Sequence, residues 1–321
     1  MATGIAVIGL GVIGRRMLEQ TRSRADLAIS GAWDVDAAAC ARAVADFPHA
    51  RIAASAEAAI ADPATRIVYV GTPPAWHAHY SALAARHGRR VFCEKPLAVD
   101  VGEGAAMVEA MRASGTPTAV NFVFASSPSV LEIERRLAAG AIGPPRELEV
   151  RLFFSRWPRD WQAGADWLRY RAEGGFVREV LSHFVYLMDK LFGACTPVAS
   201  HVIWQEDASL CERGLVARLD CAGIPAWVTA SAGAAGPDVV EFTVRGERGA
   251  LRLANWLMLS QSDGERWSPV EVPLGGHPDL RTAMYQAQLD SLARFERGEP
   301  HPLPDMATAL RVQRTIEALL A

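Results

Sequence analysis

Three groups of residues have the types and the spacing that redox chemistry on a small molecule needs. The segment Gly9–Gly14 carries glycines at its first, third and sixth positions. Lys95 precedes a proline after a strand-like run, and Glu179 lies four residues before His183 in a helix-like run. The glycines could receive a phosphate group, whereas the lysine, the glutamate and the histidine could exchange protons with a bound substrate.

The glycine-rich segment follows an apolar run, Ile5–Ile8, and precedes a helical pattern. In such a turn the first glycine permits the bend, the second admits a pyrophosphate and the third lets the helix pack close to the strand. The free backbone amides at the helix start would face the phosphates. We therefore expect a dinucleotide to bind at Gly9, Gly11, Val12, Ile13 and Gly14.

Asp34 lies just after the second strand-like run, twenty residues beyond Gly14. At this position an acidic side chain accepts hydrogen bonds from the adenine-ribose hydroxyls. The alternative is a helix N-cap before Ala37, a role that Asp36 could serve equally well. No arginine or lysine lies within a few residues to hold a 2′-phosphate, so the sequence favours NAD over NADP.

Lys95 follows the predicted strand Arg90–Cys93, at the carboxyl edge of a parallel sheet, where ligands bind. Near a positively charged nicotinamide and in a partly dry site, its ammonium would give up its proton more readily. The residue could then accept or donate a carbinol proton. The alternative is a solvated surface lysine, but Pro96 restricts the backbone of Lys95 to an extended, fixed form.

Glu179 and His183 would share one face of a predicted helix, Gly175–Phe192. A carboxylate beside an imidazole orients the ring and favours its protonated form, which suits a proton relay. An ordinary helix pair is the alternative. No metal site is predicted, because this pair has no third ligand and because His77 and His79, two apart on a predicted helix, point in different directions.

Aromatic residues concentrate in the loop-like segment between Phe154 and Gly174. Indole rings there could stack on a sugar or an aromatic ring and so line a substrate site. Equally, they could anchor the loop to the sheet. Arginines interspersed among them hint at an anionic substrate such as a carboxylate. The candidate substrate residues are Trp157, Trp161, Trp167 and Tyr170.

The first part of the chain alternates strand-like and helix-like runs, which predicts right-handed βαβ units around a parallel sheet. Strands are expected at Ile5–Ile8, Leu27–Trp33, Ile67–Val70, Arg90–Cys93 and Thr118–Phe122. Helices are expected at Arg15–Arg22, Ala37–Ala45, Trp76–His87 and Val101–Ala113. We therefore assign residues 1–122 to an α/β Rossmann domain that binds NAD(P).

Residues 123–321 predict an α+β domain with an open, mostly antiparallel sheet, for substrate binding and oligomerisation. Its strands are expected at Glu147–Phe154, His201–Trp204, Leu215–Asp220, Ala226–Ala230, Val239–Arg245 and Leu251–Leu259. Its helices are expected at Leu131–Ala139, Gly175–Phe192, Arg281–Phe295 and Met306–Leu320. The last two helices could pack back on the first domain. Glu147, Glu149 and Arg151 alternate onto the second face of one strand, which makes that face mixed.

Composition excludes several classes of partner. The 321 residues include 33 basic and 36 acidic ones, for a net charge of −3, which attracts neither nucleic acid nor an anionic membrane. The five cysteines are scattered without a CxxC pair, which argues against a disulfide framework or zinc and fits a reducing compartment. Neither a signal peptide nor an apolar run of membrane-spanning length is evident, so we expect a cytoplasmic protein.

Further motifs accompany these residues in a fixed order. Gly71-Thr72-Pro73-Pro74 with His77 follows one strand, Glu94-Lys95-Pro96 follows the next, and Gly174-Gly175 precede Glu179 and His183. In this order and spacing the chain resembles the Gfo/Idh/MocA oxidoreductases over nearly its whole length. The resemblance implies hydride transfer between a nicotinamide and a carbinol or carbonyl carbon of a sugar, a cyclitol or a related cyclic diol.

The resemblance also implies residue roles. Lys95 corresponds to a residue that is commonly catalytic, and His183 to a further active-site group, whereas Thr72, Pro73, His77 and Glu94 would border the cofactor. It further implies a homodimer or homotetramer formed through the second-domain sheet. The chain departs from the family pattern near the substrate. Glu179 replaces the usual aspartate, Leu181 a glycine and Tyr186 an aspartate, and Phe122-Val123-Phe124 lacks the usual arginine.

Two other functions stay open at this point. One is an NAD-assisted hydrolase or lyase, in which the cofactor oxidises and then re-reduces a single substrate. The other is a catalytically silent NAD-binding sensor, against which the presence of Lys95 and His183 counts. Net conversion of NADH would indicate a dehydrogenase or reductase, turnover without net conversion an internal redox cycle, and binding alone a sensor.

Overall fold

The computed structural model describes residues 2–162 and 164–321, and the chain divides into two compact units. The first unit comprises residues 1–122 and 288–310, and the second comprises residues 123–287 and 311–321. The segment 288–310, which lies in and between the two predicted C-terminal helices, therefore belongs with the N-terminal residues. Each unit has its own sheet.

The first unit contains a five-stranded parallel sheet in the order β2-β1-β3-β4-β5. Its strands are β1 (Thr3–Ile8), β2 (Leu27–Trp33), β3 (Thr65–Val70), β4 (Arg90–Glu94) and β5 (Thr118–Asn121). Nearly all residues of β1 and β3 are buried, as expected for strands covered on both faces. The strand order reverses between β1 and β3, and ligands of such sheets bind at the carboxyl ends of these strands.

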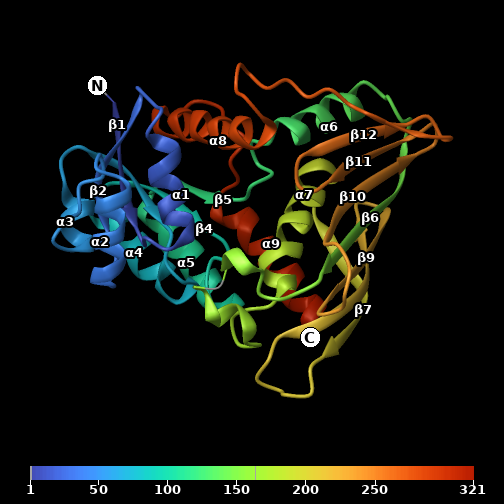
Figure 1. Ribbon diagram of the computed structural model, residues 1–321, viewed down its shortest axis with the longest axis horizontal. Coiled ribbons are helices and arrows are strands. Elements are labelled where there is room, and N and C mark those ends of the chain that lie inside the picture. Colours follow the sequence, from blue (N-terminus) through green and yellow to red (C-terminus); the bar gives the residue numbers. More distant parts are fainter. Residues whose placement is uncertain (1, 163) are drawn as a thin grey trace. The chain divides into compact units, whose positions relative to one another are not determined.

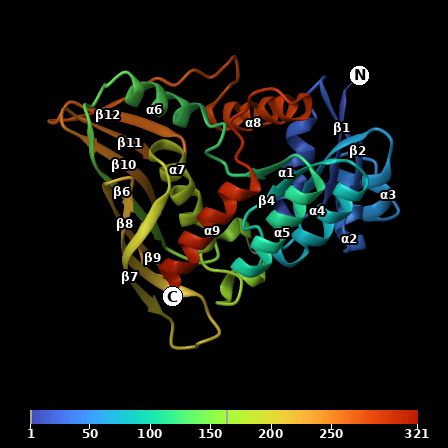
Figure 2. The same cartoon turned by 180° about the vertical axis from the view of Figure 1, so that it is seen from behind.

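Helices cover both faces of this sheet. They are α1 (Val12–Thr21), α2 (Ala37–Asp46), α3 (Ala56–Ala61), α4 (His77–Arg86) and α5 (Val101–Ser114), with a 3-10 turn, η1 (Pro74–Trp76), before α4. Helices α1 and α2 lie in front of the sheet in Figure 1, and α4 and α5 lie in front of it in Figure 2. The predicted Rossmann architecture is thereby confirmed. The short helix α3 was not expected from the sequence.

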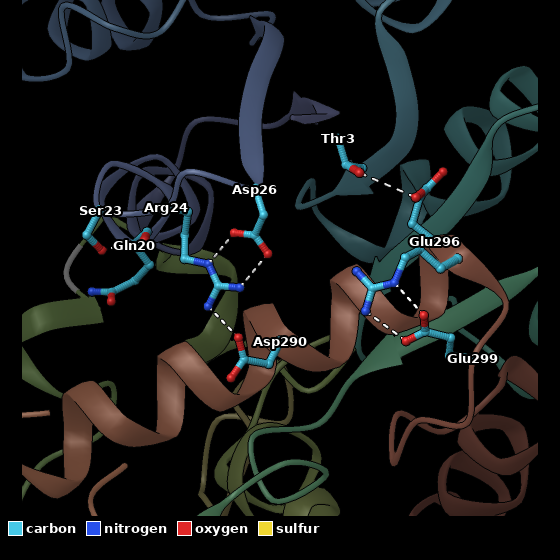
Figure 3. A network of polar contacts seen from close by, with 9 residues as sticks. Thr3, Gln20, Ser23, Arg24, Asp26, Asp290, Glu296 and Glu299 are labelled. Carbon is cyan, nitrogen blue, oxygen red and sulfur yellow. Dashed lines mark hydrogen bonds and ion pairs between the residues drawn. The ribbon is translucent and has the colours of Figure 1, made fainter. Parts of the chain in front are cut away.

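The C-terminal half of α8 (Leu280–Arg297) is tied to the first unit by charged side chains (Figure 3). The Arg24 guanidinium bonds to Asp26 at 2.8 Å and to Asp290 of α8 at 2.5 Å. The Thr3 hydroxyl donates to Glu296, also on α8, at 3.3 Å. These contacts explain why residues 288–297 group with the N-terminal sheet.

The second unit contains an eight-stranded sheet in the order β13-β12-β11-β10-β6-β9-β8-β7. Its strands are β6 (Pro145–Phe154), β7 (Cys195–Trp204), β8 (Glu212–Cys221), β9 (Ile224–Ala232), β10 (Val239–Gly246), β11 (Ala250–Ala254), β12 (Met258–Ser262) and β13 (Trp267–Pro269). All neighbours are antiparallel except β6 and β9, which confirms the predicted mostly antiparallel sheet.

The two faces of this sheet differ as predicted. Leu148, Val150 and Leu152 of β6 are buried on one face. On the opposite face, Arg245 of β10 bonds to Glu149 at 2.8 Å. Around the sheet lie α6 (Pro128–Ala138), η2 (Asp160–Gln162), η3 (Asp166–Arg169), α7 (Ser182–Phe192), which packs against β7 and β8, and residues 311–320 of α9 (Met306–Leu320).

Two sequence predictions that concern the strands of this unit are wrong. The run Leu251–Leu259 is not one strand, because Asn255 and Trp256 adopt positive φ angles of 49° and 71° and turn the chain between β11 and β12. The cysteines also include one bonded pair, Cys195 with Cys221, whose residues lie opposite each other on β7 and β8. Their separation of 26 residues in the sequence does not reveal this cross-strand register.

Candidate active site

The glycine turn between β1 and α1 has the geometry that a dinucleotide needs. Gly9 has a φ of 97°, and a Cβ on Gly14 would lie 1.8 Å from the Gly9 carbonyl oxygen. A Cβ on Gly11, in contrast, would meet no atom within 4 Å. No side chain caps the start of α1, so the amides of Val12 and Ile13 are offered to a ligand. The residues present fit a bound pyrophosphate.

Asp34 is held by backbone groups at the end of β2. Its carboxylate accepts the Leu10 amide at 2.6 Å and the Asp36 amide at 2.8 Å. Asp36, not Asp34, caps α2 by accepting the Ala38 amide at 2.9 Å. Asp34 therefore lies against the glycine turn, with lone pairs left for ribose hydroxyls. Arg42, which the sequence reasoning did not consider, pairs with Asp36 at 3.3 Å.

Two aromatic residues near Asp34 have no role predicted from the sequence. Tyr80 packs edge-on against Trp33 at 6.2 Å between ring centroids, and Trp76 of η1 lies 6.3 Å from Tyr80. Burial raises the pKa of Tyr80, and the charge of Asp34 adds to this shift. The Trp76 side chain is 53% exposed, which is uncommon for so large an apolar ring. Its place at the start of the predicted helix Trp76–His87 gave no sign of this exposure.

His77 joins the two turns that the motifs predicted. Its fully buried ring contacts the Thr72 carbonyl oxygen through Nε2 and the Pro96 carbonyl oxygen through Nδ1, both at 2.8 Å. Burial lowers the pKa of His77, and the two carbonyl contacts oppose that shift. The Oγ1 atom of Thr72 is buried without a partner in the described part of the chain, which leaves it available to a cofactor. His79 is exposed, so the two histidines do diverge.

Lys95 is half-buried between two anchored neighbours at the end of β4. On one side, the Glu94 carboxylate accepts hydrogen bonds from the Tyr69 hydroxyl and, at 2.6 Å, from the Asn121 amide. On the other side, a cis peptide bond leads to Pro96, whose carbonyl oxygen contacts His77. The Lys95 backbone is therefore fixed at the same sheet edge as the glycine turn.

Glu179 lies in a π-helical turn, Val177–Leu181 (η4), and not in the predicted α-helix. The α-helix begins only at Ser182, so the expected continuous helix Gly175–Phe192 is corrected at its first turn. The Glu179 Oε1 atom accepts the Gln162 amide at 3.2 Å, and Gln162 in turn accepts the Arg159 Nε at 3.0 Å. Single π-turns within helices occur frequently at functional sites.

His183 is buried in an aromatic enclosure of the second unit. Its ring packs edge-on against Trp256 at 5.6 Å and against Phe124 at 6.3 Å. Phe124 and Trp256 stack on each other at 5.6 Å. Trp256 was missed from the sequence because its segment was read as a strand. Tyr186, one of the family departures, is also buried, and burial raises its pKa.

The aromatic loop residues divide into anchors and exposed groups. Trp157 donates its indole N–H to the Leu168 carbonyl at 3.0 Å and packs on Phe154 and Phe176, which makes it an anchor. Trp161 is 46% exposed, with the Arg159 guanidinium 4.7 Å from its ring centre. Trp167 is half-buried and Tyr170 is 42% exposed. The structure thus leaves Trp161 and Tyr170 more accessible to a ligand than Trp157.

Two absences hold for the described residues. They contain no group of three or more His, Cys, Asp or Glu side chains arranged to hold a metal ion. None of the described helices has both the length and the apolar character needed to cross a membrane.

Two family models match the chain. One, described as an oxidoreductase family with an NAD-binding Rossmann fold, matches residues 3–122. The other, described as the GFO/IDH/MocA C-terminal domain, matches residues 130–252. Among curated proteins, the scyllo-inositol 2-dehydrogenase (NAD(+)) of Bacillus subtilis is 29% identical over 142 residues, which are 44% of this chain and 39% of that protein. The chain thus matches about two-fifths of the length of this relative.

Solved structures resemble the whole chain. An oxidoreductase from Agrobacterium radiobacter, in complex with NAD+, L-tartaric acid and magnesium, gives a TM-score of 0.85 at 18% identity over 100% of this chain and 96% of that chain. A biliverdin reductase from Synechocystis, with biliverdin and NADP+, gives 0.77 at 19% identity over 99% and 98% of the two chains. At these identities the likeness establishes the fold alone.

Proposed function

Because the chain belongs to the Gfo/Idh/MocA family of oxidoreductases, we propose that it transfers a hydride between a nicotinamide dinucleotide and a carbinol or carbonyl carbon of a small molecule. The substrate class we propose is a sugar, a cyclitol or a related cyclic diol, and the inositol dehydrogenase relative supports this class. The observation that carries the proposal is that anchored neighbours fix the backbone of Lys95 at the sheet edge that also bears the glycine turn.

We propose NAD(H) as the preferred cofactor. The Asp34 carboxylate would accept the ribose hydroxyls and would repel a 2′-phosphate. The guanidinium of Arg42 forms an ion pair with the carboxylate of Asp36, which argues against a site for the 2′-phosphate of NADP at Arg42. The predicted cofactor residues are Gly9, Gly11, Val12, Ile13, Gly14, Asp34, Thr72, Pro73, His77, Glu94 and Lys95.

In the proposed reaction Lys95 is the principal acid–base. A bound nicotinamide would supply the hydride acceptor or donor. When a carbinol is oxidised, its O–H proton would pass to an unprotonated Lys95 Nζ and its hydride to the nicotinamide, and reduction would run the same transfers in reverse. His183 would act on the same oxygen as an orienting or relaying partner, and Glu179 would hold the imidazole. A reversal of the two roles would appear as the larger loss of turnover in the His183 variant.

A substrate panel tests the proposal. Sugars, cyclitols and cyclic diols are incubated with NAD+ or, for the corresponding carbonyl compounds, with NADH, and the absorbance of NADH is followed. We expect net conversion of the cofactor with at least one member of this class. Turnover of substrate without net conversion would replace the proposal by an internal redox cycle, and cofactor binding without turnover would replace it by a sensor.

We also propose self-association through the open sheet and residence in the cytoplasm, where such dinucleotides are abundant. A dimer or a tetramer would cover the sheet face that carries the Arg245 and Arg151 ion pairs. The disulfide between Cys195 and Cys221 provides a test of the proposed cytoplasmic location, because cytoplasmic thiols are normally reduced. Because both residues are buried, the thiols are alkylated in denaturant without a reducing agent, and reduced protein from the cytoplasm should be modified at both cysteines.

A further inference from the structure

A buried carboxylate lies beneath the start of the helix that bears Glu179 and His183. Glu212, the first residue of β8, is 2% exposed, and its Oε1 atom accepts the Val177 amide at 2.7 Å. Val177 is the first residue of the π-turn. The Oε2 atom of Glu212 is buried and has no hydrogen-bond partner within residues 2–162 and 164–321. Nothing in the sequence indicated a role for this glutamate.

The second glycine of the Gly174-Gly175 pair makes room for this carboxylate. Gly175 has a φ of 100°, and a Cβ placed there would lie 2.3 Å from the Glu212 Oε2 atom. The Gly175 carbonyl oxygen also accepts the Glu179 amide at 3.0 Å. Gly175 therefore contacts the buried carboxylate on one side and, on the other, the helix that bears Glu179 and His183.

We propose that Glu212 is a positioning residue for Glu179 and His183, which holds the first turn of their helix through the Val177 amide and holds it more firmly when ionised. A charged carboxylate bonds an amide about twice as strongly as a neutral acid does. Its negative charge also interacts favourably with the positive end of the helix dipole at the helix N-terminus. The inference rests on the roles proposed above for Glu179 and His183.

The titratable groups around Glu212 are Cys211, which directly precedes it, Arg178 of the π-turn and Glu317 of α9. Burial raises the pKa of Glu212 to about 7, the Val177 amide and Arg178 oppose this shift, and Glu317 adds to it. Arg178 is bound by both oxygens of Glu317, at 2.7 and 2.8 Å, so the charge of Glu317 offsets part of the effect of Arg178 on Glu212. The Cys211 thiol, whose pKa burial raises to about 12, stays neutral.

These surroundings make the ionisation of Glu212 change near neutral pH. Its pKa in the folded state, about 7, lies above the value of 4.5 for a free glutamate. A raised carboxyl pKa means that the folded state binds more protons between these two values. The contribution of Glu212 to stability is therefore greatest below pH 4.5 and is lost as the pH rises through 7. Ionisation thus tightens the helix start while it costs global stability.

The first experiment compares the pH dependence of turnover in the wild type, Glu212→Gln and Glu206→Gln. Glutamine keeps an acceptor oxygen for the Val177 amide but cannot ionise, and Glu206 is an exposed glutamate that serves as the control. Between pH 6 and 8, the wild type and the control should gain about threefold to tenfold in kcat that Glu212→Gln lacks, with an unchanged KM for NAD. An identical pH profile in all three proteins would overturn the proposal.

The second experiment needs no substrate. The hydrogen-exchange protection factor of the Val177 amide is measured at pH 6 and pH 8. Because this factor is a ratio to the intrinsic exchange rate at the same pH, the intrinsic pH dependence of exchange cancels. It should rise about threefold to tenfold in the wild type and stay constant in Glu212→Gln. A constant wild-type value would refute the hold on the helix, whatever reaction the protein catalyses. If protection changes but no substrate turns over, the proposed function fails and the hold by Glu212 stands.

Thermal melting completes the test. Glu212→Gln should melt at a higher temperature than the wild type at pH 8, and at the same temperature near pH 4.5, by the sign of the pKa shift. A variant that melts lower at both values would show that the carboxylate is only a structural acceptor.

Discussion

The candidate site of the first unit is built mainly from backbone groups, whereas that of the second unit is built from side chains. In the first unit, Asp34 is held by two amides and His77 by two carbonyl oxygens. In the second, Glu179 is held by the Gln162 amide group, and His183 is enclosed by aromatic rings. Backbone geometry tolerates changes of side chain that a packed enclosure does not. This difference suits a constant cofactor and a substrate that varies between relatives.

The largest expected effect tests whether the two sites act on one reaction. Lys95→Ala and His183→Ala should each lower kcat by about 10²–10⁴-fold, the usual contribution of a positioned acid or base. NAD binding should change little, because in our proposal the glycine turn and Asp34 supply most of the contacts with NAD. Steady-state kinetics with the identified substrate and a fluorescence titration of NAD measure the two quantities.

Lys190→Ala is the matched control, since Lys190 pairs with Glu134 at 2.7 Å and neither residue has a role in the proposed chemistry. It should retain wild-type turnover. Full activity in Lys95→Ala would rule out the proposed acid–base role and leave the sensor and the internal redox cycle as the better explanations.

The next effect separates folding from binding within the glycine turn. Gly14→Ala places a Cβ 1.8 Å from the Gly9 carbonyl oxygen, so it should lower both the melting temperature and the NAD affinity. Gly11→Ala meets no protein atom within 4 Å and has an ordinary φ of −66°. It should therefore melt nearly as the wild type does and lose NAD affinity alone. Equal NAD affinity in Gly11→Ala would show that the pyrophosphate does not approach this backbone.

The first unit could be predicted closely because its geometry follows from short-range rules. A strand, a glycine turn and a helix in sequence define a βαβ unit, and parallel strands bring Gly9, Thr72 and Lys95 to one edge. The place of His77 between two carbonyl oxygens was not predictable, because the neutral sequence Ala-Trp-His-Ala gives no sign of which groups will surround the ring.

The second unit depends on contacts between residues far apart in the sequence. Glu212 reaches Val177 over 35 residues, and Cys195 meets Cys221 only through the register of β7 and β8. The π-turn adds one residue per turn without any change in the hydrophobic pattern that predicted a helix. Asn255 and Trp256 turn the chain although a tryptophan at positive φ is rare. Local patterns therefore identified the elements but not the bends that shape the site.

A smaller effect tests the choice of cofactor. Asp34→Ala should weaken NAD binding by about 1–3 kcal/mol, the cost of losing hydrogen bonds to a charged group. Asp36→Ala is its control two residues away, because it removes the N-cap of α2 and should lower stability by about 1 kcal/mol without a comparable loss of NAD affinity. Titration of both cofactors provides the decisive comparison, and tighter binding of NADP than of NAD by the wild type would contradict the assignment of Asp34.

The smallest expected effect concerns the charged face of the second sheet. Arg245 bonds to Glu149 at 2.8 Å and to Glu147 at 3.4 Å, with all three side chains partly exposed. Such a surface network contributes about 0.2–1 kcal/mol to the folding of a single chain. In a dimer formed through this face, the same charges lose water, and removal of Arg245 leaves two carboxylates unpaired in the interface.

Arg245→Ala should therefore change the melting of the isolated chain little and shift the proposed dimer or tetramer towards monomer. Arg146→Ala provides the control. Arg146 lies on β6, the strand that carries Glu147 and Glu149, and it pairs with Glu247, but alternation along the strand places it with the Leu148 face. Light scattering at micromolar concentration measures both variants. A monomeric wild type would exclude this interface. The charged network on β6 and β10 would then be an ordinary solvated face of the sheet.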